Sequence, residues 1–147
     1  MMRSLLLLLA FSAASLCINV TIKNNCKKIV RPVVQEWVEV GGAPGDVHQE
    51  VLNAGQKATF TYTLSTIDVK NGANGKNFAR IVTLSDVPMS MYMIDRGAGF
   101  DTGMRIGAND ATLVPPINCQ QATCFAPQTM KSNAVDYVGT FIITFCP

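Results

Sequence analysis

The sequence is poor in the side chains from which many enzyme active sites are built. It contains a single histidine, His48, and no serine or cysteine is tied to it by a catalytic motif. Only 15% of its residues are charged, and the formal net charge is +2. Nucleic acids and anionic membranes are bound by basic stripes, which this balance does not provide. We therefore expect no nucleic-acid partner, and no metal or cofactor, because zinc sites need several histidine or cysteine ligands.

Long apolar runs are absent except near the first residue. There, Arg3 precedes an apolar segment and then small residues, which is the pattern of a secretory signal peptide. The segment is too short to cross a bilayer. Cleavage after Ala14 and cleavage after Cys17 both fit this pattern. We expect residues 1–17 to be the signal peptide and residues 18–147 to form one secreted, extracellular domain without a membrane span.

Helical periodicity is also missing, and a two-residue alternation replaces it. In residues 137–147, Phe141 and Ile143 alternate with threonines, as in a strand with one buried face. Residues 18–26 alternate in the same way. Further short strands are separated by glycine, proline and asparagine turns. The chain is therefore expected to be all-β, with the architecture of a β-sandwich.

Cysteines are few, and cleavage after Cys17 would leave four of them: Cys26, Cys119, Cys124 and Cys146. Four cysteines allow three pairings. We infer that the first and last strands lie side by side, with Cys26 joined to Cys146, which leaves a small loop closed by the other two. In the chain-entropy model, closing the long loop stabilises the fold by about 4–5 kcal/mol. If Cys17 is retained, it is a free thiol or an intermolecular link.

Three inner segments carry further expectations. Residues 57–64 predict a strand with alternate apolar residues facing inward and a row of threonines facing outward. Residues 65–77 contain two Asn-Gly pairs and are expected to form an exposed loop. Residues 118–133 are expected to be irregular. Methionines at spacing two, including Met91 and Met93, are expected to lie in the core.

Four motifs resemble the thaumatin/osmotin family. The first strand ends in N-x-C at residues 24–26, and the chain closes with I-T-F-C-P at residues 143–147. Residues 52–60 are similar to the family segment L-N-x-G followed by an aromatic residue, and residues 86–90 resemble its V-P-M stretch. The family pairs its first and last cysteines. The chain thus looks like a short, divergent member with few cysteines, and the resemblance implies a disulfide-stapled β-sandwich like the family's core domain.

The resemblance also implies a carbohydrate site. The family carries an acidic cleft associated with β-1,3-glucan binding and, in some members, weak glucanase activity. Asp86 looks like the aspartate that precedes the family's V-P-M, and Arg80 resembles its cleft arginine. The family's partner aspartate falls on Ile81, and no residue matches the cleft glutamate. The tentative carbohydrate-binding residues are Arg80, Asp86, Tyr92, Asp95 and Phe100.

These observations predict a secreted, monomeric protein that binds polysaccharide or an extracellular partner protein in defence or host–microbe interaction. One alternative is a weak endo-β-1,3-glucanase. Another is an effector or hydrolase inhibitor that acts through residues 65–77 or 118–133. Asn19 begins the sequon N-V-T and is a tentative glycosylation site. Trp37 is expected to pack at the core or its rim, with a stacking platform for a sugar ring as the alternative.

Overall fold

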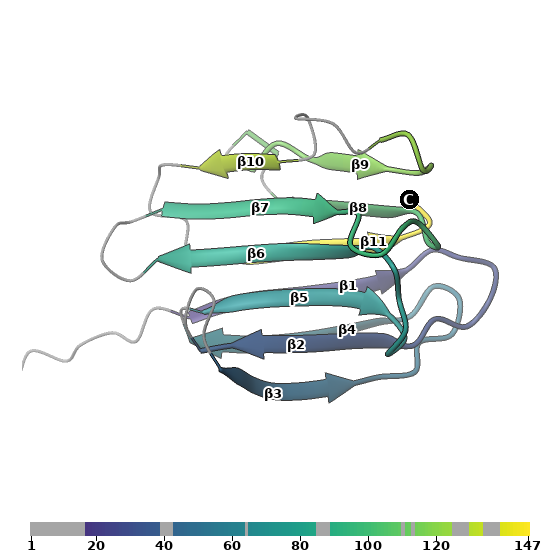
Figure 1. The fold of residues 1–147 in the computed structure, drawn as a ribbon, viewed down its shortest axis with the longest axis horizontal. Coiled ribbons are helices and arrows are strands. Elements are labelled where there is room, and N and C mark those ends of the chain that lie inside the picture. The colour runs from purple at the N-terminus through teal and green to yellow at the C-terminus, as the bar shows by residue number, and fades with distance from the viewer. Residues whose placement is uncertain are drawn as a thin grey trace, which may run out of the picture.

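The protein folds into two β-sheets that pack face to face (Figure 1). The computed structural model describes residues 17–38, 43–63, 65–84, 89–109, 111–112, 114–124, 130–133 and 139–147. All the regular elements of these residues are strands. Within these ranges, no helix has the length and apolarity needed to cross a bilayer. The expected all-β, two-sheet class is therefore confirmed.

The five-stranded sheet brings the two ends of the chain together. Its strands, in spatial order, are β4 (Lys57–Thr63), β1 (Cys17–Asn24), β11 (Thr140–Phe145), β8 (Met104–Ala108) and β9 (Ile117–Cys119). β1 pairs with β11 in parallel, from Asn19 opposite Thr140 to Asn24 opposite Phe145. The expected pairing of the first and last strands is therefore confirmed.

The six-stranded sheet is entirely antiparallel and faces the viewer in Figure 1. Its strands, in spatial order, are β10 (Met130–Asn133), β7 (Met89–Asp95), β6 (Phe78–Leu84), β5 (Thr66–Asn71), β2 (Pro32–Trp37) and β3 (Pro44–Gln49). Pro32 is the first residue of β2, where its missing N–H does not interrupt the ladder.

The core lies between the sheets and follows the strand period. β1 and β11 bury every second side chain, as expected, and the six-stranded sheet covers them with its own inward row. The inward residues of these four strands are Ile18, Val20 and Ile22, Phe141, Ile143 and Phe145, Ile67 and Val69, and Ala79 and Ile81. Because successive side chains of a strand point to opposite faces, the intervening residues lie on the outer surfaces.

The expectation of an exposed loop over residues 65–77 is wrong. Residues 66–71 of this segment form β5, which lies between β6 and β2 near the middle of its sheet. Ile67 and Val69 are fully buried, whereas Asp68 faces the outer side. The Asn-Gly signal is correct only after the strand, where Gly72 has a φ of 82°. A charged residue between two apolar ones weakened the apolar signal of a strand that is buried on one face.

Two smaller expectations also fail. Residues 118–133 contain the end of β9 and all of β10, so they are more regular than expected. Met91 and Met93 of β7 do not lie in the core: both are half-buried on the outer side, while Tyr92 is buried between the sheets. The Tyr92 ring packs 5.8 Å from the ring of Phe141. The larger aromatic side chain therefore fills the core in place of the methionines.

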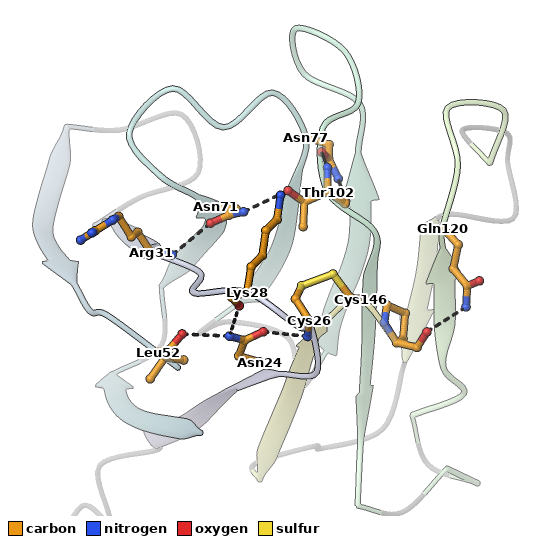
Figure 2. The surroundings of a disulfide bond; sticks show 11 residues. Asn24, Cys26, Lys28, Arg31, Leu52, Asn71, Asn77, Thr102, Gln120 and Cys146 are labelled. Carbon is orange, nitrogen blue, oxygen red and sulfur yellow. Dashed lines mark hydrogen bonds between the residues drawn. A yellow bond between two sulfur atoms is a disulfide. The ribbon is translucent and has the colours of Figure 1, made fainter. Parts of the chain in front are cut away.

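Both expected disulfides are present, and the longer one ties the ends of β1 and β11 together. Cys26 is bonded to Cys146 across 120 positions of sequence, and Cys119 is bonded to Cys124 across 5. Figure 2 shows that Asn24 lies beside the long disulfide, and its side chain bonds to three backbone groups, at Cys26, Lys28 and Leu52. This end of the sandwich is therefore stabilised both by a disulfide and by the side-chain hydrogen bonds of Asn24.

A first prediction concerns Tyr62 of β4, which is buried at the edge of the core. Burial, followed by the charges of Glu36 and Asp46, raises the pKa of Tyr62 from 10.0 to about 12. Above about pH 10 the unfolded chain therefore loses this proton before the folded chain does, and the free energy of unfolding falls as the pH rises towards about 12. Tyr62→Phe should make this alkaline fall shallower, as measured by urea unfolding at several pH values.

The control for this prediction is Tyr92→Phe at neutral pH. The Tyr92 hydroxyl donates to the carbonyl of Pro115 at 2.8 Å, and its loss should cost about 1 kcal/mol. The Tyr62 hydroxyl has no hydrogen-bond partner among the described residues. Tyr62→Phe should therefore leave the free energy of unfolding nearly unchanged at pH 7. An alkaline fall that is equally steep with and without the Tyr62 hydroxyl would contradict the assignment.

Candidate functional site

The outer face of the six-stranded sheet carries two rows of side chains that the strand register places side by side. The first row consists of Val47, Gln35, Asp68, Arg80 and Met93, from β3 to β7. The second row consists of Gln49, Val33, Lys70, Phe78 and Asp95. Opposite residues of neighbouring antiparallel strands have Cβ atoms about 4.5–5.5 Å apart. Charged, aromatic and amide groups from five strands are therefore gathered on one surface.

The centre of this surface is a network built on Asp68. Arg80 donates from Nε to Asp68 Oδ1 at 2.6 Å and from Nη2 to Asp68 Oδ2 at 2.7 Å. Trp37 donates from Nε1 to Asp68 Oδ2 at 3.0 Å. The Arg80 guanidinium also lies 4.9 Å from the centre of the Phe78 ring, within the range of a cation–π contact. The carboxylate thus holds a tryptophan and an arginine in a defined orientation.

Electrostatics favour the charged form of Arg80. The hydrogen bonds that Arg80 donates to Asp68 raise the pKa of Arg80, with smaller contributions from the charges of Asp68 and Asp95, and desolvation opposes them. A bidentate pair of this kind has a fixed plane and fixed donor directions. Arg80 is therefore a permanent cation at a set position on the sheet.

A depression of about 550 Å³ lies over this network. We call it the outer-face depression, and its lining residues are Val33, Gln35, Trp37, Val47, Gln49, Asp68, Lys70, Ala73, Gly75, Lys76, Phe78, Arg80, Gly97 and Ala98. A smaller hollow of about 160 Å³ shares Val33, Gln49 and Ala73 with it and reaches Arg31. The two hollows therefore follow one another along the sheet face.

The structure brings only part of the expected carbohydrate site together. Arg80 lines the outer-face depression. Asp95 lies opposite Phe78 in the neighbouring strand, and its Oδ1 accepts a hydrogen bond from the Gly97 N–H at 2.7 Å, so it borders the depression. Asp86 lies outside the described residues.

Two expected site residues are placed elsewhere. Tyr92 is only 1% exposed, and the strand period turns it towards the core. Its assignment to a carbohydrate-binding surface is wrong, because a ligand on the outer face does not reach a side chain between the sheets. Phe100 is half-buried and packs against the core cluster, and it does not line the outer-face depression.

The tentative glycosylation site lies on the other outer surface. Asn19 belongs to β1, and its Oδ1 accepts a hydrogen bond from the hydroxyl of Thr61 on β4 at 2.7 Å. Thr21 of the same sequon is within 2.8 Å of the Thr59 hydroxyl. The sequon is therefore on the five-stranded sheet, facing away from the outer-face depression.

Sequence reasoning missed most of the residues that form the depression. Asp68 and Lys70 were hidden because residues 65–77 were interpreted as a loop. Trp37 was expected to pack at the core or its rim, with a stacking platform as the alternative. In the structure its side chain is half-buried and lines the outer-face depression. The alternation of Ile67 and Val69 with charged residues was the signal that could have revealed β5 and its outward side chains.

Comparison with known proteins supports the fold. No protein-family model matches the sequence, and no curated protein is similar to it at a significant level. The thaumatin-like xylanase inhibitor TLXI is similar in structure, with a TM-score of 0.61 and 18% identity over 87% of this chain and 99% of the inhibitor. The protein elicitor MoHrip2 from Magnaporthe oryzae is similar with a TM-score of 0.58 and 20% identity, over 88% of this chain and 98% of the elicitor. The chain therefore has the fold of the thaumatin-like proteins, as its sequence motifs implied.

Proposed function

We propose that this protein is secreted and binds a polysaccharide across the outer-face depression. The observation that carries the proposal is the network in which Asp68 orients Trp37 and Arg80. Sugar rings have apolar faces that stack on aromatic side chains and hydroxyl rims that need fixed polar partners. Trp37 and Phe78 provide aromatic surface, and Arg80 and neighbouring glutamines provide hydrogen-bonding groups. An open hollow that continues into a second one suits an extended chain.

The depression supports binding better than hydrolysis. A glycosidase of the usual kind needs two carboxyl groups that flank the scissile bond. Among the described residues, Asp68 is the one carboxylate that lines the outer-face depression. Its oxygens already accept three hydrogen bonds. We therefore propose retention of the polysaccharide without release of reducing ends.

Two observations support a role outside the cell. The structure contains two disulfides, which persist in oxidising compartments. A xylanase inhibitor and a protein elicitor are among the similar solved structures. We therefore place the polysaccharide-binding role in defence or host–microbe interaction.

A partner protein is the second candidate, and exposed apolar residues favour it. Val38, Val47 and Val51 are 63%, 50% and 51% exposed, and all three lie in or next to the hairpin of β2 and β3. β3 is also an edge strand of its sheet. Edge strands offer backbone groups to another chain. Inhibition of a cell-wall hydrolase without retention on any polysaccharide would favour this candidate.

Trp37→Ala tests the polysaccharide proposal. We expect the wild-type protein to sediment with at least one insoluble cell-wall polysaccharide, and the variant to bind it at least about tenfold more weakly because the stacking surface is lost. The measurement is a depletion isotherm on glucan, xylan and pectin, with reducing-sugar assays run in parallel. Thr63→Ala, an exposed change on β4 of the other sheet, is the control and should bind normally. Absence of wild-type binding to every polysaccharide, or equal binding by Trp37→Ala, would overturn the proposal.

A further inference from the structure

The residues that line the outer-face depression carry more positive than negative charge. Three cationic side chains line it, Lys70, Lys76 and Arg80, against the single carboxylate of Asp68, which leaves a net charge of +2. The formal net charge of the whole sequence is also only +2. The positive charge is therefore concentrated at the site and does not reflect a generally basic surface.

The two lysines have no acidic partner within the described residues. The ion pair between Arg80 and Asp68 is the one salt bridge that these residues form. Two acidic residues beside the depression bond to backbone instead: Asp95 Oδ1, at the end of β7, accepts from the Gly97 N–H, and Asp101 Oδ2 accepts from the Lys76 N–H at 2.8 Å. The ammonium groups of Lys70 and Lys76 are thus left to an outside anion.

The positive side chains also follow the direction in which the hollows continue. Arg80 lies at one side of the outer-face depression, Lys70 and Lys76 line the same depression, and Arg31 lines the smaller hollow beyond Ala73. Glu50 is the one carboxylate of that second hollow. A ligand that spans both would pass several cations in succession, which suits a polymer that carries a negative charge on successive units.

We infer that the ligand is an acidic polysaccharide, with a carboxylate on its sugar units, and that Lys70 and Lys76 select it over a neutral glucan. This inference rests on the proposed function and adds the chemical class of the ligand. An ammonium group pairs with a single carboxylate as a point charge, while Trp37 and Phe78 supply the aromatic surface for ring faces. Aromatic surface beside the cations favours a sugar over an acidic peptide or a bare phosphate.

The experiment compares polygalacturonate with its methyl ester and with laminarin, which is neutral. Affinity is measured by calorimetry or affinity electrophoresis at about 50 mM and about 200 mM salt. We expect the wild-type protein to bind polygalacturonate at least about tenfold more tightly than the ester, and this preference to shrink as salt increases. Lys70→Gln with Lys76→Gln should remove the preference, and Lys70→Arg with Lys76→Arg should keep most of it.

The matched control is Lys23→Gln with Lys57→Gln. These two exposed lysines lie opposite each other on β1 and β4, so the variant has the same net charge change on the other sheet. We expect it to bind polygalacturonate as the wild type does. Thermal unfolding of each variant shows whether it is folded, and the arginine pair remains informative if the glutamine pair unfolds.

The outcomes separate this inference from the proposed function. Equal binding of polygalacturonate, its ester and laminarin would overturn the inference and leave the proposed function standing. Failure to bind any polysaccharide would overturn both. If poly-glutamate binds as tightly as polygalacturonate, the site recognises a polyanion in general, and the inference that its ligand is a sugar polymer is refuted. If the Lys23 and Lys57 control loses as much affinity for polygalacturonate as the Lys70 and Lys76 variant, the assignment of binding to the outer-face depression is refuted.

Discussion

Replacing Cys26 and Cys146 together by alanine is expected to lower the free energy of unfolding by about 5 kcal/mol. The bond joins residues 120 positions apart, so its loss frees almost the whole unfolded chain. Globular domains are stable by only about 5–15 kcal/mol, and the variant should therefore be partly or largely unfolded at 37 °C. The measurement is urea unfolding of the variant and the non-reduced wild type, followed by circular dichroism and tryptophan fluorescence.

The second disulfide is the internal control for this result. Cys119 and Cys124 are only 5 positions apart, and the same chain-entropy relation assigns their bond about 2 kcal/mol. Replacing both by alanine should therefore cost less than half as much. Equal losses in the two double variants would show that loop closure is not the source of the stability.

Asn24→Ala is expected to lower the free energy of unfolding by about 3 kcal/mol or more, although Asn24 does not line the outer-face depression. Its side chain is fully buried. The Nδ2 group donates to the carbonyls of Lys28 at 2.9 Å and Leu52 at 2.8 Å, and Oδ1 accepts from the Cys26 N–H at 2.8 Å (Figure 2). Truncation leaves the Lys28 carbonyl and the Cys26 N–H without this partner, while the Leu52 carbonyl still accepts from the Val30 N–H at 3.1 Å. Each buried group that is left unsatisfied costs about 1–3 kcal/mol.

Asn25→Ala is the matched control for Asn24→Ala. Asn25 is the next residue and is exposed, and its backbone N–H donates to the Phe145 carbonyl at 3.1 Å. A surface change of this kind should alter the free energy of unfolding by less than about 0.5 kcal/mol. Urea unfolding of both variants gives the comparison. Similar small losses in the two would rule out the three hydrogen bonds as a main fastening.

Asn24 also explains why N-x-C was an informative motif. An asparagine side chain that accepts from the N–H two residues later forms a local turn. Here that turn ends β1 and presents Cys26 to Cys146 at a Cα–Cα distance of 5.0 Å. The spacing could therefore be recognised in the sequence, whereas the hydrogen bond from Asn24 Nδ2 to the distant Leu52 carbonyl could not.

The candidate site was predicted only in part. Arg80 was named because its surroundings resemble a family motif, and it lies at the centre of the network. Its partner Asp68 was missed, because two Asn-Gly pairs after β5 made the whole segment look like a loop. Tyr92 was assigned to the surface, although the buried face of β7 holds its ring. Short-range signals identified strands and turns, but they did not determine which face of each strand was buried.

The sequence alone determined the class of the protein: an all-β chain, the alternation that buries one face of β1 and β11, and the pairing of these two strands' ends through sulfur. These features depend on neighbours along the chain or on the few cysteines, so they are readable without coordinates. The tertiary structure decided the site. Trp37, Asp68 and Arg80 belong to three strands, and only the register between those strands brings an indole, a carboxylate and a guanidinium into hydrogen-bonding distance. Register is a property of strand pairs, and a single strand's sequence does not contain it.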